Sequence, residues 1–149
     1  MNAEHIKIKG QVSIRGYNES GQQVLSIDKE NLVVTTGKER MARLLATGNS
    51  DFVLDSIGFG TGAAAPTLAD VALTAQFSKT IGAASYPTAN SVKFDWSLEF
   101  AEYNGNTIRE LGLLTGVGAG DEKLFSRIVT DPIAKTSGLR LEGSWTITF

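Results

Sequence analysis

The sequence predicts a mainly β protein, an antiparallel β-sandwich of jelly-roll or immunoglobulin-like type with about eight strands and one or two short helices. Apolar and polar residues alternate over several stretches, most regularly at residues 91–100 and 139–149, which is typical of strands with one buried face. These stretches are short and mostly joined by turns. Only residues 36–47 carry strong helical signals.

Residues 1–149 are expected to form a single domain, because this length can bury a sizeable core and no repeat or linker divides the chain. Cysteine is absent, which excludes disulfides, thiolate metal sites and cysteine nucleophiles. With 14 basic and 16 acidic residues the formal net charge is −2. A nucleic-acid-binding protein usually carries a basic excess, so we expect no nucleic-acid partner.

No membrane partner is expected either. The first residues, MNAEHIKIKG, lack the apolar run of a signal peptide. No window approaches the roughly 20 apolar residues that cross a bilayer. We therefore expect synthesis in the cytoplasm, with export only as part of a larger particle.

The N-terminal third is expected to form three strands, at residues 5–17, 23–27 and 32–35. The first strand places four aliphatic side chains on one face: Ile6, Ile8, Val12 and Ile14. A polar turn is expected between the second and third strands. Its Asp28, Glu30 and Asn31 are an alternative calcium site, although three such residues are also common in ordinary turns.

The clearest helix follows the third strand. Thr36 is expected to be its N-cap, with Glu39 completing a capping box, and Gly48 suits the left-handed residue that ends a helix. The predicted apolar stripe consists of Met41, Leu44 and Leu45.

A mixed strand is expected at residues 52–59, followed by a second, short helix. Thr67 would cap this helix and Asp70 would reciprocate. The side chains expected to pack on the core are Leu68, Val71 and Leu73. Another strand is expected at residues 77–81, followed by a loop of small residues at 82–90.

Residues 91–114 are expected to form a long β-hairpin at the centre of the core. The predicted buried face consists of Val92, Phe94, Trp96, Leu98 and Phe100. A two-residue turn at Asn104-Gly105 would be favourable, but it places Glu99 opposite Glu110. A turn shifted by one residue pairs Glu102 with Arg109 instead, and we prefer this register.

The C-terminal part is expected to contain a glycine-rich flexible connector at residues 116–121 and two strands. The first, at residues 124–129, would be broken by Asp131-Pro132. The last runs from residue 139 to 149 and buries Trp145. From their positions in strand-like segments, we hypothesise that Glu110 and Arg127 form an ion pair.

No catalytic, cofactor-binding or metal-binding residues are predicted. The only histidine, His5, has no marked partner for acid–base or nucleophilic chemistry. Gly58-x-Gly60-x-x-Ala63 nearly matches the dinucleotide fingerprint, but a helix would have to begin at once, and the predicted one starts several residues later. Three carboxylates are candidates for glycoside hydrolysis: Asp95, Glu99 and Glu110. We expect them to be solvated or ion-paired rather than catalytic.

Three patches together resemble virion structural proteins of tailed bacteriophages, especially small tail, baseplate and fibre-associated components. The first is IGFGTG at 57–62 with the following PT and DVAL; the second is NTIRELGL at 106–113. The third comprises LFSR at 124–127, IAKT at 133–136 and LEGSWTITF at 141–149. The resemblance implies a non-enzymatic structural component of a tail, baseplate or fibre attachment, located in the virion and acting as a homo-oligomer. A capsid decoration protein is the nearest alternative.

The expected partners are other copies of the chain and neighbouring virion proteins. They would dock on strand edges, on the small-residue loops at 60–65 and 82–85, or on residues 1–14. Residues 1–14 either form a local strand or act as an arm that pairs with a neighbouring subunit. From a different class, a carbohydrate- or receptor-binding module would use turn tyrosines to stack on host-surface glycans: Tyr17, Tyr86 and Tyr103.

Overall fold

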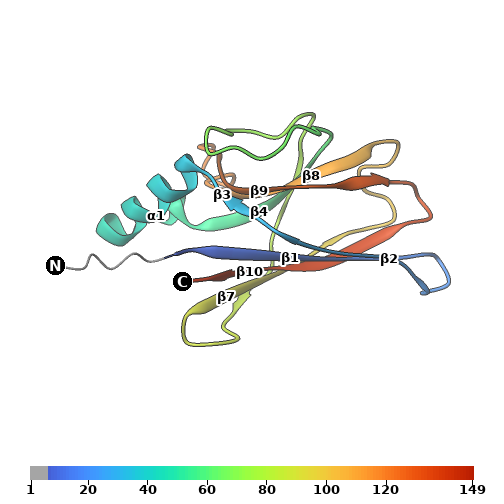
Figure 1. The fold of residues 1–149 in the computed structure, drawn as a ribbon, viewed down its shortest axis with the longest axis horizontal. Helices are drawn as coiled ribbons and strands as arrows, with labels where there is room; N and C mark the ends of the chain where they lie inside the picture. Colours follow the sequence, from blue (N-terminus) through green and yellow to red (C-terminus); the bar gives the residue numbers. More distant parts are fainter. Residues whose placement is uncertain (1–6) are drawn as a thin grey trace.

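The computed structural model describes residues 7–149 as two five-stranded antiparallel sheets packed face to face (Figure 1). Sheet A has the order β2-β1-β10-β7-β6 and contains β1 (Lys9–Tyr17), β2 (Gln23–Glu30), β6 (Ala84–Ser85), β7 (Ser91–Leu98) and β10 (Arg140–Thr148). Sheet B has the order β3-β9-β8-β4-β5 and contains β3 (Leu32–Val33), β4 (Leu54–Gly60), β5 (Phe77–Thr80), β8 (Thr107–Thr115) and β9 (Lys123–Ala134). The predicted antiparallel β-sandwich is confirmed, with ten strands in this part of the chain rather than about eight.

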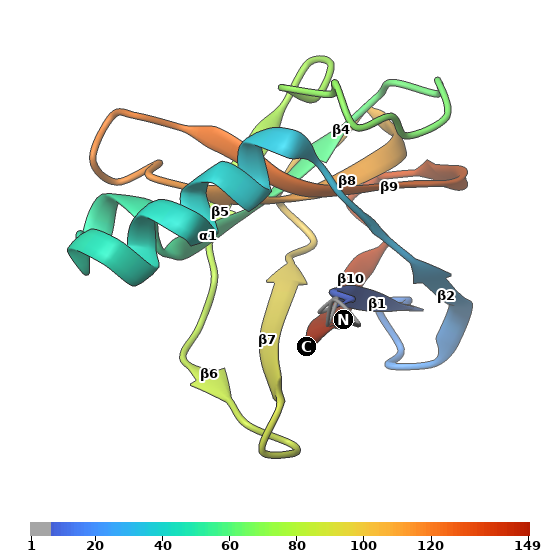
Figure 2. The ribbon, with the colours of Figure 1, turned by 60° about the vertical axis from the view of Figure 1, so that its left-hand side comes forward.

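Helical structure in the described residues is limited to α1 (Thr35–Thr47) and the short 3-10 helix η1 (Ser50–Phe52). Figure 2 shows α1 beside sheet B, away from sheet A. Residues 61–76, between β4 and β5, also lie over the outer face of sheet B (Figures 1 and 2). No helix formed by residues 7–149 lies on the outer face of sheet A.

The core lies between the two sheets, where the predicted alternation is confirmed. Trp145 is fully buried, and Trp96 is 6% exposed and meets Phe59 of the opposite sheet edge to face, with ring centroids 5.5 Å apart. Val12 pairs with Trp145, which also pairs with Phe94 on its other side. The two tryptophans therefore tie β1, β10 and β7 to sheet B.

Gly143 makes room for Trp96 within sheet A. A Cβ added at Gly143 would lie 2.5 Å from Cζ2 of Trp96 and 2.0 Å from the backbone oxygen of Ser13. We expect Gly143→Ala to lower the free energy of unfolding by about 1–3 kcal/mol through overpacking. Gly82→Ala is the control, since its Cβ would come no closer than 3.8 Å to another atom. Urea denaturation checks this, and equal midpoints for the two variants would contradict it.

The predicted hairpin at residues 91–114 is wrong, although both of its strands exist. β7 belongs to sheet A, where it pairs with β10, while β8 belongs to sheet B and pairs with β4 and β9. The apolar faces of β7 and β8 therefore meet across the core instead of lying side by side. The hairpin in this region is formed by β8 and β9, and the predicted flexible connector at 116–121 is its turn, closed by a hydrogen bond from Asp121 N to Gly116 O.

The Asn104-Gly105 turn belongs to the connection between the sheets. Gly105 has a φ of 82° and its N–H donates to the backbone oxygen of Lys135. The buried Lys135 ammonium donates to Asn104 Oδ1 at 2.9 Å and to the Thr136 carbonyl at 3.1 Å. The Asn-Gly sequence thus correctly predicted that the chain reverses here. The chain then enters sheet B instead of returning alongside β7.

The N-terminal strand lies inside sheet A. β1 is paired with β10 along one edge and, from Gln11 onward, with β2 along the other, so residues 11–14 have no free edge for a neighbouring subunit. The first six residues of the expected arm, including His5, lie outside the described part. The predicted polar turn at 28–31 is also wrong over most of its length, because β2 continues to Glu30 and Asp28 pairs with Arg15 at 3.2 Å.

The end of α1 is as predicted but its beginning is not. Gly48 closes the helix in the left-handed conformation. At the other end the N-cap position is Val34, and the hydroxyl of Thr36 donates to the Leu124 carbonyl at 2.6 Å instead of capping the helix. Of the predicted stripe, Met41 packs against the core and Leu44 is half-buried, whereas Leu45 is 87% exposed and lies outside the buried face.

Arg40 fixes α1 to the adjoining turns. It is buried, donates to Asp121 Oδ2 at 2.7 Å and stacks over the ring of Phe52, 5.0 Å from the centroid. Gly37 is also buried, with the backbone of Phe125 where its Cβ would be. A glycine and a paired arginine therefore belong to the contact face of α1 together with Met41, and the apolar pattern indicated only Met41.

Asp131-Pro132 does not break its strand. β9 continues to Ala134, and the register with β8 shifts between the pair Ile108↔Ile133 and the pair Glu110↔Val129. A bulge is one of the few places where a sheet accepts a proline, because the ladder hydrogen bond is already missing there.

Candidate interaction surface

A buried ionic network lies on the outer face of sheet B, beneath residues 61–76. Arg127 of β9 donates from Nε to Glu110 Oε2 of β8 at 2.7 Å, and the two side chains are 5% and 2% exposed. The hypothesised pair is confirmed. Arg127 also donates from Nη1 to Asp70 Oδ2 at 2.9 Å. One guanidinium therefore joins two strands of the sheet to the segment above them.

The network holds the backbone of residues 61–76 at several points. Glu110 Oε1 accepts hydrogen bonds from the N–H of Gly62 at 2.9 Å and from the N–H of Thr74 at 2.6 Å. Arg127 Nη2 donates to the carbonyl of Ala64 at 2.9 Å. Charge-assisted bonds of this kind are stronger than neutral ones, so the buried charges fix the shape of the loop.

The small residues of this loop allow it to approach the carboxylate. A Cβ on Gly62 would lie 2.7 Å from Glu110 Oε1, and one on Gly60 would lie 2.5 Å from the same atom. Gly58 and Gly60 belong to β4 itself. The resemblance to a dinucleotide fingerprint arises from a strand end and a carboxylate contact, with no helix following.

The predicted short helix after Pro66 is absent; the segment forms a turn. Thr67 and Asp70 do reciprocate, because the Thr67 N–H and hydroxyl both donate to the Asp70 carboxylate at 2.9 Å. Of the three side chains expected in the core, only Leu73 is buried. Leu68 and Val71 are 49% and 66% exposed, so the turn presents them to the surface.

The surroundings of two acidic side chains, Asp70 and Glu102, favour their ionised forms. Burial alone would raise the pKa of Asp70, but hydrogen bonds from Thr67 and the nearby Arg127 outweigh it, and the net shift is downward. The pKa of Glu102 is likewise lowered, with burial opposing and the hydrogen bond from Lys79 prevailing. Folding therefore favours the charged form of both groups.

We expect acid to destabilise the protein through these groups. A lowered folded-state pKa gives a stabilisation that is complete above the unfolded-state value, about 4, and is lost as pH falls through the folded-state value. The free energy of unfolding, measured in urea from pH 7 to pH 2, should therefore fall below about pH 4. In Asp70→Asn the free energy of unfolding should fall less steeply with pH than in the wild-type protein. The same pH dependence in both would contradict a contribution from Asp70.

Asp95, Glu99 and Glu102 are ion-paired or exposed, as expected. The partner of Glu102, however, is not the predicted one. Glu99 accepts from Arg140 at 2.8 Å, and Asp95 is exposed near Lys93. Glu102 pairs with Lys79 of β5 at 2.6 Å rather than with Arg109, because β7 and β8 are in different sheets.

Strand edges offer little for docking. The edge strands β3 and β6 have two residues each and β5 has four. The long edge strand β2 places Lys29 opposite Val12, on the side of the sheet that faces the core. Short edges and inward-pointing charges are devices that discourage strand addition.

The three turn tyrosines differ in accessibility. Tyr103 stacks on Phe77 with centroids 5.5 Å apart and donates its hydroxyl to the Ala75 carbonyl at 2.7 Å, so it is a local packing residue. Tyr17 is half-buried at the end of β1, and Tyr86 is 76% exposed.

Two hollows also lie on the surface formed by the described residues. A groove of about 760 Å³ lies where β1 begins beside β3 and α1. A shallower hollow of about 350 Å³ lies on the outer face of sheet A, lined by polar residues that include Ser13, Arg15, Asp95, Glu142 and Ser144. Residues 7–149 contain no group of three or more histidine or acidic side chains placed to hold a metal ion.

No protein-family model, curated protein or solved structure matches this chain. Among the helices that the structure describes, none has the length and apolar character to cross a membrane.

Proposed function

We propose that this protein is a non-enzymatic structural component of a bacteriophage particle, at the tail, baseplate or fibre attachment, that docks on other copies of itself and on neighbouring virion proteins. The observation that carries the docking role is the segment of residues 61–76. It is fixed by buried charges and presents Leu68 and Val71 to solvent. The three resembling sequence patches supply the expectation of a virion.

A preordered apolar turn suits docking for an energetic reason. Ordering a loop on binding costs conformational entropy, and a loop already held in place avoids that cost. The Glu110–Arg127–Asp70 network provides this order without using the exposed side chains. The partner then gains the burial of Leu68 and Val71 directly.

Light scattering coupled to size exclusion tests the self-association part of this proposal. We expect the wild-type chain to form a concentration-dependent oligomer, and Leu68→Ser/Val71→Ser to shift it toward monomer. Val24→Ser is a matched control, because Val24 is 57% exposed on the edge strand β2, distant in the chain from the turn. A monomeric wild-type protein at high concentration, or equal assembly of both variants, would contradict docking between copies through this turn.

The outer face of sheet A favours a second candidate, a carbohydrate- or receptor-binding module. Its hollow combines hydroxyl groups with both signs of charge, which suits a neutral, polyhydroxylated ligand. A glycan array tests this candidate. Specific binding that is lost in Ser144→Trp would support it, and no binding to any glycan would remove it. A capsid decoration protein remains the alternative position within the particle.

A further inference from the structure

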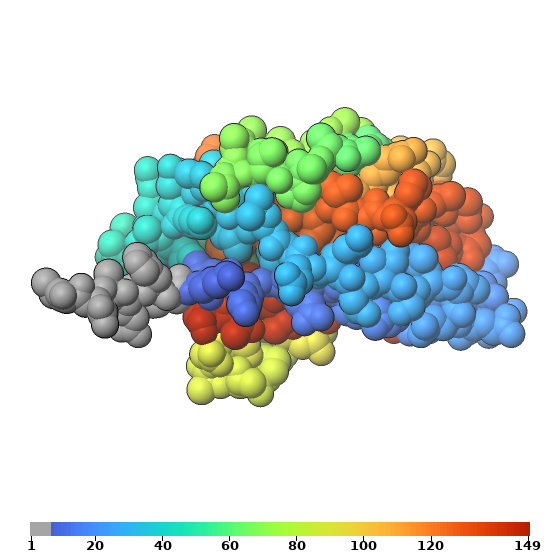
Figure 3. All heavy atoms as spheres, viewed as in Figure 1, coloured from blue at the N-terminus to red at the C-terminus, as the bar shows by residue number. Residues whose placement is uncertain are grey.

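The groove beside β1 has features that the surface turn at residues 61–76 does not explain. It is lined by the start of β1, the passage from β2 to β3, the first part of α1 and the end of β10. In Figure 3 the β1 and β3–α1 segments, blue and cyan, face the viewer below residues 61–76. Its volume of about 760 Å³ lies within the range of ligand sites in proteins.

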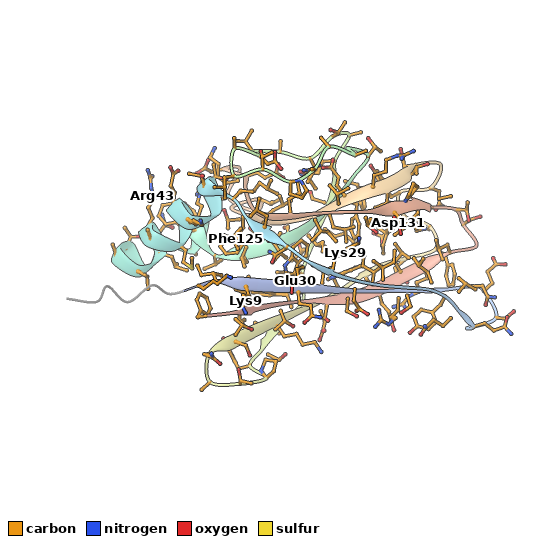
Figure 4. The ribbon with its side chains drawn as sticks, viewed as in Figure 1. Lys9, Lys29, Glu30, Arg43, Phe125 and Asp131 are labelled. Carbon is orange, nitrogen blue, oxygen red and sulfur yellow. The ribbon has the colours of Figure 1, made fainter. Side chains whose placement is uncertain are left out.

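The charge of the groove is one-sided. Lys7, Lys9 and Lys38 line it, against a single carboxylate, Glu30. Within residues 7–149 none of these three lysines forms an ion pair. Lys9 and Glu30 lie on neighbouring strands, as Figure 4 shows. In a protein of net charge −2, this local excess of positive charge favours an acidic occupant.

The lining of the groove also contains an unpaired amide. The Oδ1 and Nδ2 atoms of Asn31 are both shielded from water, and neither has a hydrogen-bond partner in the described structure. The side chain fits only because residue 10 is glycine: a Cβ there would lie 1.7 Å from Oδ1. An unmade buried hydrogen bond costs about 1–3 kcal/mol. Both atoms are shielded, so an occupant of the groove bonds to them only if the Asn31 side chain turns away from Gly10.

A peptide group is the natural complement of that amide, because it presents one donor and one acceptor side by side. β3 lies at an edge of sheet B, next to Asn31, with β9 as its one neighbour in the described sheet. Leu32 and Val33 add apolar surface to the lining. With two residues, β3 supplies only a short backbone pairing, so the lysines and the apolar lining carry most of the recognition.

We propose that this groove binds an extended acidic polypeptide segment of a neighbouring protein, with Lys7, Lys9 and Lys38 recognising carboxylates and Asn31 recognising the backbone. The inference names the chemistry of one docking partner and rests on the proposed assembly function. A nucleic acid fits less well, because the lysines do not extend into a basic stripe and the lining carries no aromatic base platform.

Fluorescence anisotropy with the full chain tests this inference. The probes are three labelled oligomers of equal length: an eight-residue peptide of alternating glutamate and valine, the same peptide with lysine for glutamate, and an eight-nucleotide oligothymidylate. We expect the acidic peptide to bind and to weaken as salt rises, and the other two to bind at least about tenfold more weakly.

Two variants locate the site. Lys9→Glu/Lys38→Glu should weaken the acidic peptide about tenfold or more, whereas Lys93→Glu, a charge change on β7, should not. Asn31→Leu should weaken binding without altering its dependence on salt, which a purely electrostatic role would not predict. Circular dichroism melting curves show that each variant is folded.

No binding of the acidic peptide, equal binding by Lys9→Glu/Lys38→Glu, or tighter binding of the oligothymidylate would each overturn this inference. Those outcomes would leave the light-scattering test of Leu68 and Val71 unaffected, because that test uses no peptide. A monomeric wild-type protein, or equal assembly of the Leu68→Ser/Val71→Ser and Val24→Ser variants, together with intact peptide binding, would instead contradict the docking turn alone.

Discussion

Replacing Trp145 by alanine is expected to lower the free energy of unfolding by about 3–5 kcal/mol. The indole is fully buried between the sheets, and its strand neighbours Val12 and Phe94 face the same core. Removing it leaves a cavity that rigid strands on both sides cannot close. The same loss is expected for Trp96→Ala, because Trp96 meets Phe59 across the core.

Urea denaturation with a matched pair of variants measures this effect. Trp145→Phe should cost much less than Trp145→Ala, since it keeps an aromatic ring, and the Trp145 Nε1–H that it removes has no hydrogen-bond partner in the described structure. Tyr86→Ala, at an exposed site, should stay within about 0.5 kcal/mol of wild type. A cost for Trp145→Ala as small as that of Tyr86→Ala would show that the indole is not in the core.

Breaking the Glu110–Arg127 pair is expected to cost about 3–5 kcal/mol, because it leaves one buried charge without its main partner. Glu110→Ala strands the guanidinium beside Asp70 and also frees the N–H groups of Gly62 and Thr74. Arg127→Met leaves the Glu110 carboxylate with those two backbone donors only. We expect Glu110→Ala to be the more damaging of the two.

A double-mutant cycle separates this coupling from the cost of each truncation. The double variant should be less destabilised than the sum of the single variants, by about 0.5–3 kcal/mol. Asp95→Asn is the control for an exposed pair: Asp95 and Lys93 lie 3.6 Å apart at the surface, and a pair of that kind contributes at most about 1 kcal/mol. Additive costs for Glu110 and Arg127 would contradict the pairing.

The strands were predictable from the sequence because alternation is a local property. Each buried residue of β7 and β10 could be assigned to a face from its neighbours two positions away. The pairing of strands was not predictable in the same way. β7 joins β10, far along the chain, and its nearest successor β8 joins the other sheet, since packing between distant segments decides the pairing.

In the ionic network beneath residues 61–76, too, one contact was predictable from the local sequence and another was not. Glu110 and Arg127 could be linked beforehand because both stand in strand-like sequence, and the structure confirms their contact. Asp70 was expected only to cap a helix, and nothing in the local pattern indicated its bond to Arg127, 57 positions away. The exposure of Val71 was missed for a related reason: an amphipathic pattern was assigned to a segment that buried charges hold as a turn.

Amide hydrogen exchange at Gly62 and Thr74 tests the central claim most directly, namely that buried charges hold residues 61–76 in one shape. Both amides donate to Glu110, so in the wild-type protein they should exchange as slowly as core amides of β8, and in Glu110→Ala they should exchange orders of magnitude faster. Exchange in the wild-type protein as fast as at the exposed turn residue Glu19 would contradict the account.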